Sequence, residues 1–138
     1  MKKLLIIAQV LTISVLLILS NNVQGQTANN VYCTIDNNKP LAAGTSDDLN
    51  LLMYVTNNGN PITYLVQDYF KLSFISVPYG FVGGTLSVDG LINENNGLYR
   101  VQADILDRDR WARGTYIILY EVGIVGSKNS GLFTFSIP

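Results

Sequence analysis

From Tyr99 to Ile105 apolar and polar side chains alternate without interruption, within a predicted strand over Leu98–Leu106. The apolar members are Tyr99, Val101, Ala103 and Ile105. A period of two places one set of side chains in a core and the other in solvent, as in a half-buried β-strand. No ten-residue window after residue 25 has a convincing helical period of 3.6 residues. We therefore expect an all-β domain.

Seven other segments show short apolar patterns bounded by Gly, Asn, Asp or Pro. With the segment above, the predicted strands are Val31–Ile35, Leu49–Val55, Ile62–Val66, Lys71–Val77, Thr85–Val88, Leu98–Leu106, Thr115–Val122 and Leu132–Ile137. Seven or eight strands of this length indicate an antiparallel sandwich or barrel, because parallel strands need long crossover connections. We also expect a hairpin turn at Asp89–Gly90 and one helical turn at Asp68–Phe70. The predicted aromatic core comprises Tyr99, Tyr116, Phe133 and Phe135.

Residues 1–25 have the three-part layout of a secretory signal peptide. A basic start precedes Leu4–Leu19, an apolar run of 16 residues, and a polar stretch ends at Gly25. A permanent transmembrane anchor needs about 20 apolar residues, so we expect cleavage after Gly25. The predicted parts are a signal-peptide helix in residues 1–25 and one β-domain in residues 26–138. A bacterial export route then places the domain in the periplasm, at the cell surface or in the medium, with no membrane contact after cleavage.

The composition excludes several classes of chemistry. The chain has no histidine and one cysteine, which excludes Ser-His-Asp and Cys-His nucleophiles and zinc sites that rely on imidazole. Without the two lysines of the predicted leader, seven basic side chains face ten acidic ones, so we expect no nucleic acid partner. Cys33 has no internal disulfide partner. We favour a small buried hydrophobe there, and an intermolecular disulfide is the alternative.

Four stretches resemble parts of bacterial immunoglobulin-like domains. Tyr54–Leu65 is similar to their sequence of a strand, a Gly-Asn-Pro turn and a second strand. The others are the strand entries Gly97–Val101 and Trp111–Tyr116 and the closing strand Gly131–Pro138. Such domains form a tyrosine corner at the second of these entries, where this chain has Tyr116. The resemblance implies an immunoglobulin-like β-sandwich and says little about function.

Asp104, Asp107 and Asp109 are the candidate metal ligands, because calcium prefers oxygen ligands from flexible loops. The run Leu106-Asp107-Arg108-Asp109 also resembles the Leu-Asp-Arg-Glu calcium motif of cadherins, whose further acidic motifs this chain lacks. The arginines on either side of Asp109 would oppose a dication. We therefore favour a solvated loop of mutually neutralising charges, and we expect no cofactor.

Candidate binding residues lie in loops and on the solvent side of strands. Tyr79, Phe81 and Trp111 lie in predicted loops, where aromatic rings serve as anchors for proteins or sugars. A role in capping the core is the alternative for Trp111. The apolar residues on the solvent parity of their strands are Leu52, Tyr54, Ile117 and Leu119. We take Ile117 and Leu119 as candidates for a partner surface, and coverage by loops is the alternative.

These features favour an exported, non-catalytic module that binds a protein partner or belongs to an extracellular assembly. The alternative is a hydrolase or a carbohydrate-binding accessory unit, which would use the loop aromatics with Asp104, Asp107 or Asp109 on a glycan. A third interpretation is a structural component that pairs an edge strand with a neighbour. We expect no enzyme activity, since the usual catalytic side chains are absent.

Overall fold

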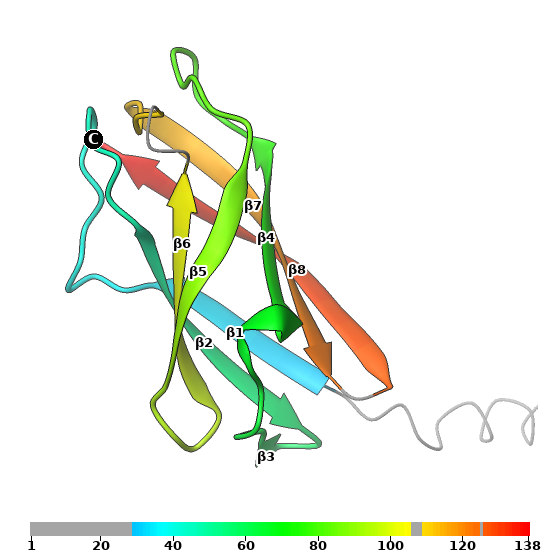
Figure 1. Cartoon of the computed structure of the whole chain (residues 1–138). Helices are drawn as coiled ribbons and strands as arrows, with labels where there is room; N and C mark the ends of the chain where they lie inside the picture. The colour runs from blue at the N-terminus through cyan, green and yellow to red at the C-terminus, as the bar shows by residue number, and fades with distance from the viewer. Residues whose placement is uncertain (1–28, 106–108, 125) are drawn as a thin grey trace, which may run out of the picture.

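The computed structural model describes residues 29–105, 109–124 and 126–138, so the predicted signal peptide lies outside the described residues. In these ranges the chain forms eight strands and one 3-10 turn (Figure 1). The elements are β1 (Asn29–Ile35), β2 (Leu49–Asn57), β3 (Asn60–Pro61), η1 (Gln67–Tyr69), β4 (Phe70–Ser76), β5 (Leu86–Asn93), β6 (Leu98–Ile105), β7 (Gly114–Ile124) and β8 (Ser127–Ile137). Within the same ranges no helix is long and apolar enough to cross a membrane.

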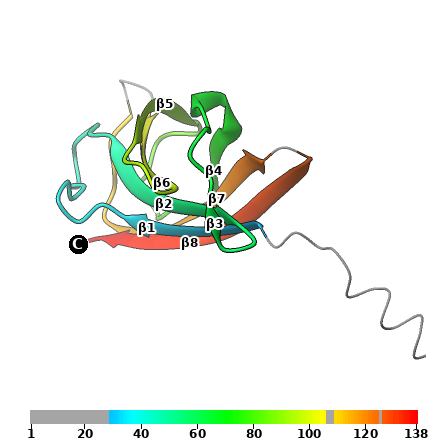
Figure 2. The ribbon, with the colours of Figure 1, turned by 90° about the horizontal axis from the view of Figure 1, so that it is seen from below.

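The strands form two antiparallel sheets that pack face to face (Figure 2). Sheet A has the order β1-β2-β6-β5, with β3 paired to β2, and sheet B has the order β4-β7-β8. The edge strands β1 and β8 lie near each other on one open side, and β4 and β5 on the other. This is the strand order of constant-type immunoglobulin domains. The prediction of an antiparallel all-β sandwich is confirmed.

The core lies between the sheets and consists of the apolar parity of each strand. In β2 and β6 the inward residues are almost completely buried, namely Leu49, Leu51, Met53, Val55, Tyr99, Val101, Ala103 and Ile105. On the side of sheet B, Tyr116 stacks on Phe135 with 5.0 Å between ring centroids, and Trp111 meets Tyr116 edge-on at 5.2 Å. The predicted aromatic core is confirmed, although Phe133 is only half-buried.

Tyr116 forms a tyrosine corner at the entry to β7. Its hydroxyl donates to the Ala112 carbonyl at 3.0 Å and accepts from the Ala112 N–H at 2.8 Å. The connection between β6 and β7 is thereby tied to the start of β7, four residues further on. This is the geometry that the resemblance to immunoglobulin-like domains implies for Tyr116.

The predicted strand Ile62–Val66 is wrong. Only Asn60–Pro61 pairs with β2, and residues 62–66 lead to η1 outside the strands. Tyr99 of β6 holds this segment instead. Its hydroxyl donates to the Ile62 carbonyl at 2.8 Å and accepts from the Leu65 N–H at 3.1 Å. Tyr99 satisfies these two backbone groups, and the Val55 carbonyl of β2 accepts the Ile62 N–H at 3.0 Å, so Ile62 and Leu65 are buried although residues 62–66 form no strand.

The predicted hairpin turn at Asp89–Gly90 is also wrong. Strand β5 continues through it to Asn93, and the dipeptide forms a β-bulge where the register with β6 shifts between Val88 and Gly90. The turn lies instead at Asn95–Gly97, where three consecutive residues have positive φ. Asn and Gly tolerate this conformation best. β5 has pairing partners along β6 on both sides of the dipeptide, and these pairs outweigh the local turn preference of Asp-Gly.

Candidate binding surface

Two of the three loop aromatics predicted to bind are part of the interior. Trp111 is 1% exposed and donates its indole N–H to the Asp47 carbonyl at 2.7 Å. Phe81 is half-buried and stacks on Trp111 with 5.8 Å between ring centroids. Tyr79 is fully exposed. The surface placement of Trp111 and Phe81 is thus corrected, since burying such rings is strongly favourable. The alternative of a core-capping role for Trp111 is confirmed.

Ile117 and Leu119 lie on the outer face of sheet B and are half-buried. The register places Leu119 opposite Leu132 of β8, whose side chain is 64% exposed. We call Ile117, Leu119 and Leu132 the aliphatic face. On the other side of β7, Ile75 sits at the β-bulge of β4 and is also exposed. The sequence pattern identified Ile117 and Leu119 of β7, whereas only the pairing register shows that Leu132 and Ile75 lie beside them.

A second apolar surface covers the outer face of sheet A, and we call it the tyrosine face. It comprises Tyr32, Leu52, Tyr54, Ile92 and Leu98. Tyr32 lies opposite Tyr54, and Tyr54 lies opposite Leu98, so the three form one row across β1, β2 and β6. Tyr32 is 69% exposed and Tyr54 is 40% exposed. A row of large apolar side chains on the solvent side of an antiparallel sheet departs from the usual polar pattern.

The sequence pattern marked Leu52 and Tyr54 as apolar residues on the solvent parity, but it missed the rest of the tyrosine face. Tyr32, Ile92 and Leu98 belong to three other strands. Their adjacency follows from cross-strand register, for which the sequence carries no local signal.

Arg100 lies among the side chains of the tyrosine face and is held between two carboxylates. Its guanidinium nitrogens lie 3.1 Å from Asp36 and 3.1 Å from Glu94. Asp36 is nearly completely buried, and its Oδ1 accepts the Asn38 N–H at 3.0 Å. A partly buried pair of this kind fixes the arginine in place, so the apolar groups around it keep a defined shape.

The end of sheet A near Asp48 is acidic. Burial, followed by the negative charges of Asp89 and Asp104, raises the pKa of Asp48 above its ordinary value. Lys39 acts in the opposite direction with a smaller effect. Asp104 shares the outward parity of β6 with Leu98 and Arg100, so this acidic end borders the tyrosine face.

The three aspartates predicted as metal ligands have different surroundings. Asp104 is half-buried on the outer side of β6, whereas Asp109 is buried against Gly83, where an added Cβ would lie 2.8 Å from its Oδ2. Asp107 lies outside the described residues. Among the residues that the structure does describe, no three His, Cys, Asp or Glu side chains gather as a metal site would require. The favoured interpretation of a solvated loop is wrong for Asp109, which is 5% exposed, and the calcium alternative stays untested.

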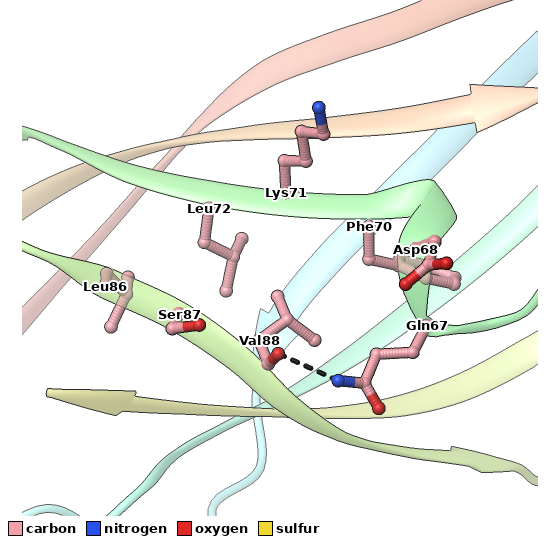
Figure 3. A pocket seen from close by; sticks show the side chains of 8 residues that line it. All are labelled: Gln67, Asp68, Phe70, Lys71, Leu72, Leu86, Ser87 and Val88. Carbon is pink, nitrogen blue, oxygen red and sulfur yellow. Dashed lines mark hydrogen bonds between the residues drawn. The ribbon is translucent and has the colours of Figure 1, made fainter.

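Each open side of the sandwich holds a groove. The groove between β4 and β5 has a volume of about 550 Å³ (Figure 3). Its apolar floor is formed by Phe70, Leu72, Leu86 and Val88. The Gln67 amide spans the opening and donates to the Val88 carbonyl at 2.9 Å, while the Lys71 side chain points away from the groove. The second groove, of about 450 Å³, lies between β8 and the end of β1.

Cys33 lies on β1 opposite Met53 and packs against the core. Burial raises the pKa of its thiol to about 12, so at neutral pH the group is a thiol and not a reactive thiolate. The interpretation of Cys33 as a small hydrophobe of the interior agrees with this placement.

No protein-family model matches the chain, and a search of curated proteins finds no match. Among solved structures, the GGA1 GAE domain of yeast is 17% identical, with 83% of this chain and 96% of that chain covered and a TM-score of 0.35. A likeness at that TM-score carries no argument about this chain. The fold assignment therefore rests on the observed sheets and their strand order.

Proposed function

We propose that this domain is a non-catalytic binding module that recognises a protein partner through the tyrosine face. The observation that carries the proposal is the exposed row of Tyr32 and Tyr54, continued by Leu98, on the solvent side of sheet A. Tyrosine offers a large, rigid and amphipathic contact surface, and it is enriched at the centres of protein interfaces.

The charges around the tyrosine face indicate the chemistry of the partner. Arg100 is already paired with two carboxylates. Burial, followed by the negative charges of Asp89 and Asp104, raises the pKa of Asp48. A lysine or arginine placed beside these aspartates would relieve their mutual repulsion. We therefore expect an apolar partner surface that is bordered by basic side chains at one end.

The size of the face sets the expected strength of binding. Four strands about 4.8 Å apart, each about seven residues long at about 3.4 Å per residue, give the whole outer face of sheet A, of which the tyrosine face is a part, roughly 450 Å². A stable interface buries about 800 Å² on each partner. The tyrosine face alone therefore supports a weak, reversible complex, and a tighter one would recruit neighbouring loops or an edge strand.

The proposed place of action is outside the cytoplasm, on the basis of the signal-peptide layout of residues 1–25. The mature chain would then begin at Gln26 as one immunoglobulin-like domain. Expression of the full chain in a bacterial host, followed by N-terminal analysis of the product in the periplasm and medium, tests this. A product that remains cytoplasmic with residues 1–25 attached would contradict export.

The binding proposal is tested by comparing two tyrosine variants. In the first, Tyr32→Ser and Tyr54→Ser are combined on the tyrosine face. In the second, Tyr64→Ser replaces a tyrosine that is 58% exposed in the connection before η1, outside that face. We expect proteins from the native envelope that bind the wild type and the Tyr64 variant, measured by quantitative mass spectrometry, to be lost from the face variant. Equal recovery with both variants would refute the role of this face.

A glycan is the second candidate ligand, because Tyr79 is fully exposed and tyrosine rings pack against sugar faces. Phe81 and Trp111 do not join Tyr79 in such a site, since Trp111 lies in the core and Phe81 packs against it. Under this function Tyr79→Ala would abolish binding to immobilised polysaccharides. Under the protein-binding function the same variant would retain the partner.

A further inference from the structure

The outer edge of β8 is long and regular. Its 11 residues pair with β7 from Gly114↔Ile137 to Ile124↔Ser127 without a shift in register, and sheet B ends at β8. From Ser130 to Ile137 the strand has no charged residue and no proline. Such an edge is a template for another strand, and natural sheets commonly protect it with charges, prolines or bulges.

The edges on the opposite side of the sandwich carry these protections. β4 has a β-bulge at Phe74/Ser76 and an exposed Lys71. β5 has the bulge at Asp89–Gly90, and the Gln67 side chain donates a hydrogen bond to the Val88 carbonyl. Two of the four edge strands are thus protected in ways that β8 is not.

A groove borders the second half of β8. Its volume is about 450 Å³, and its apolar lining comes from Ile35, Leu41, Phe133, Phe135 and Ile137. Among the described residues that line it, the acidic side chain is Asp36, which is paired with Arg100 at 3.1 Å. A strand added along β8 would direct alternate side chains toward this groove, where an unpaired charge would be costly.

The outer side of β8 also favours apolar side chains on an added strand. Leu132 is 64% exposed at the sheet edge, next to Leu119. A strand added beside β8 would place its outward side chains next to Leu132 and would extend the aliphatic face by one strand. Both parities of the added strand would therefore meet apolar surface near the middle of β8.

We propose that the β8 edge accepts an extended, uncharged strand, with bulky apolar residues at alternate positions, from another protein. Pairing along residues 130–137 would span about 27 Å and form about eight backbone hydrogen bonds. This mode of recognition is β-augmentation, in which the main chain supplies affinity and pockets for alternate side chains supply specificity. The site is separate from the tyrosine face and does not depend on it.

The probe is a designed ten-residue peptide of alternating Val and Thr with a lysine at each end. Its control is the same peptide with a central Val replaced by Pro, which removes a backbone donor. We expect the first peptide, measured by hydrogen exchange with mass spectrometry, to slow exchange in residues 130–137 at least about tenfold, a change worth about 1.4 kcal/mol. Equal slowing by the proline peptide, or no slowing by either, would overturn the proposal.

A matched pair of protein variants tests whether the site lies at β8. Thr134→Lys adds a charge on the exposed side of β8, and Ser73→Lys adds the same charge on the exposed side of β4, the opposite edge of sheet B. We expect peptide affinity to fall at least about tenfold in the first variant only. Affinity should persist when Tyr32→Ser and Tyr54→Ser are combined. If β8 is protected without peptide and the chain dimerises in analytical ultracentrifugation, its occupant is a second copy and the proposal is refuted.

Discussion

Removing one oxygen atom from the interior, by Tyr99→Phe, tests how the core holds a segment that is not a strand. The Tyr99 ring is completely buried and contacts Phe70 with 5.3 Å between ring centroids. Its hydroxyl bonds the Ile62 carbonyl and the Leu65 N–H, 37 and 34 residues away in the chain. Phenylalanine keeps the ring and loses both bonds.

The expected cost follows from what the hydroxyl leaves behind. Both hydrogen bonds are buried, and water does not readily replace the lost oxygen. An unsatisfied buried donor costs about 1–3 kcal/mol, and the carbonyl adds to this. We expect a loss of about 2–3 kcal/mol in the free energy of unfolding. For a domain of this size, at about 4 °C per kcal/mol, the melting temperature falls by about 8–12 °C.

Urea denaturation measures the change, with Tyr64→Phe as the matched control. Tyr64 lies in the same segment and is exposed, so its variant should stay within about 0.5 kcal/mol of the wild type. Hydrogen exchange should also show faster exchange of the Leu65 amide in Tyr99→Phe. If both variants unfold at the same urea concentration, the hydroxyl of Tyr99 does not hold this segment and the reasoning fails.

Four further predictions concern three buried or crowded groups. Because burial raises the thiol pKa of Cys33 to about 12, its reaction with a disulfide reagent at pH 8 should be far slower in the native protein than in urea, and equal rates would contradict its burial. Above the ordinary cysteine pKa the unfolded chain loses this proton first, so wild-type stability should fall relative to Cys33→Ala as pH rises from about 9, measured by urea titration. Because the pKa of Asp48 is raised, its ionised form destabilises the folded state. Asp48→Asn should therefore increase the free energy of unfolding by about 0.3 kcal/mol at pH 7, and this gain should disappear as the pH falls through the pKa of Asp48. Gly83→Ala would place a Cβ 2.6 Å from the Phe81 ring and 2.8 Å from Asp109, so we expect a loss of about 1–3 kcal/mol by thermal melting, whereas Gly84→Ala, with open space around it, should be near neutral.

The candidate sites could be predicted only in part. Ile117 and Leu119 were identified from parity, and they do lie on an outer face, but the exposed Leu132 beside them follows from the register. Trp111 was placed in a loop correctly, yet the rings of Phe81 and Phe135, which pack against it, come from other parts of the chain. Loop membership alone does not distinguish a ring that faces solvent from one that closes a core.

The alternation from Tyr99 to Ile105 determined by itself that this segment is a strand and which of its sides is buried, because period two is a property of the local backbone. Strand order and register were decided only in the folded molecule. They join Tyr32 to Tyr54, leave β8 at a sheet edge, and bring Tyr99 to the segment after β3. These pairings join residues far apart in the chain, and their free energy depends on how both sheets pack, so no local pattern in the sequence specifies them.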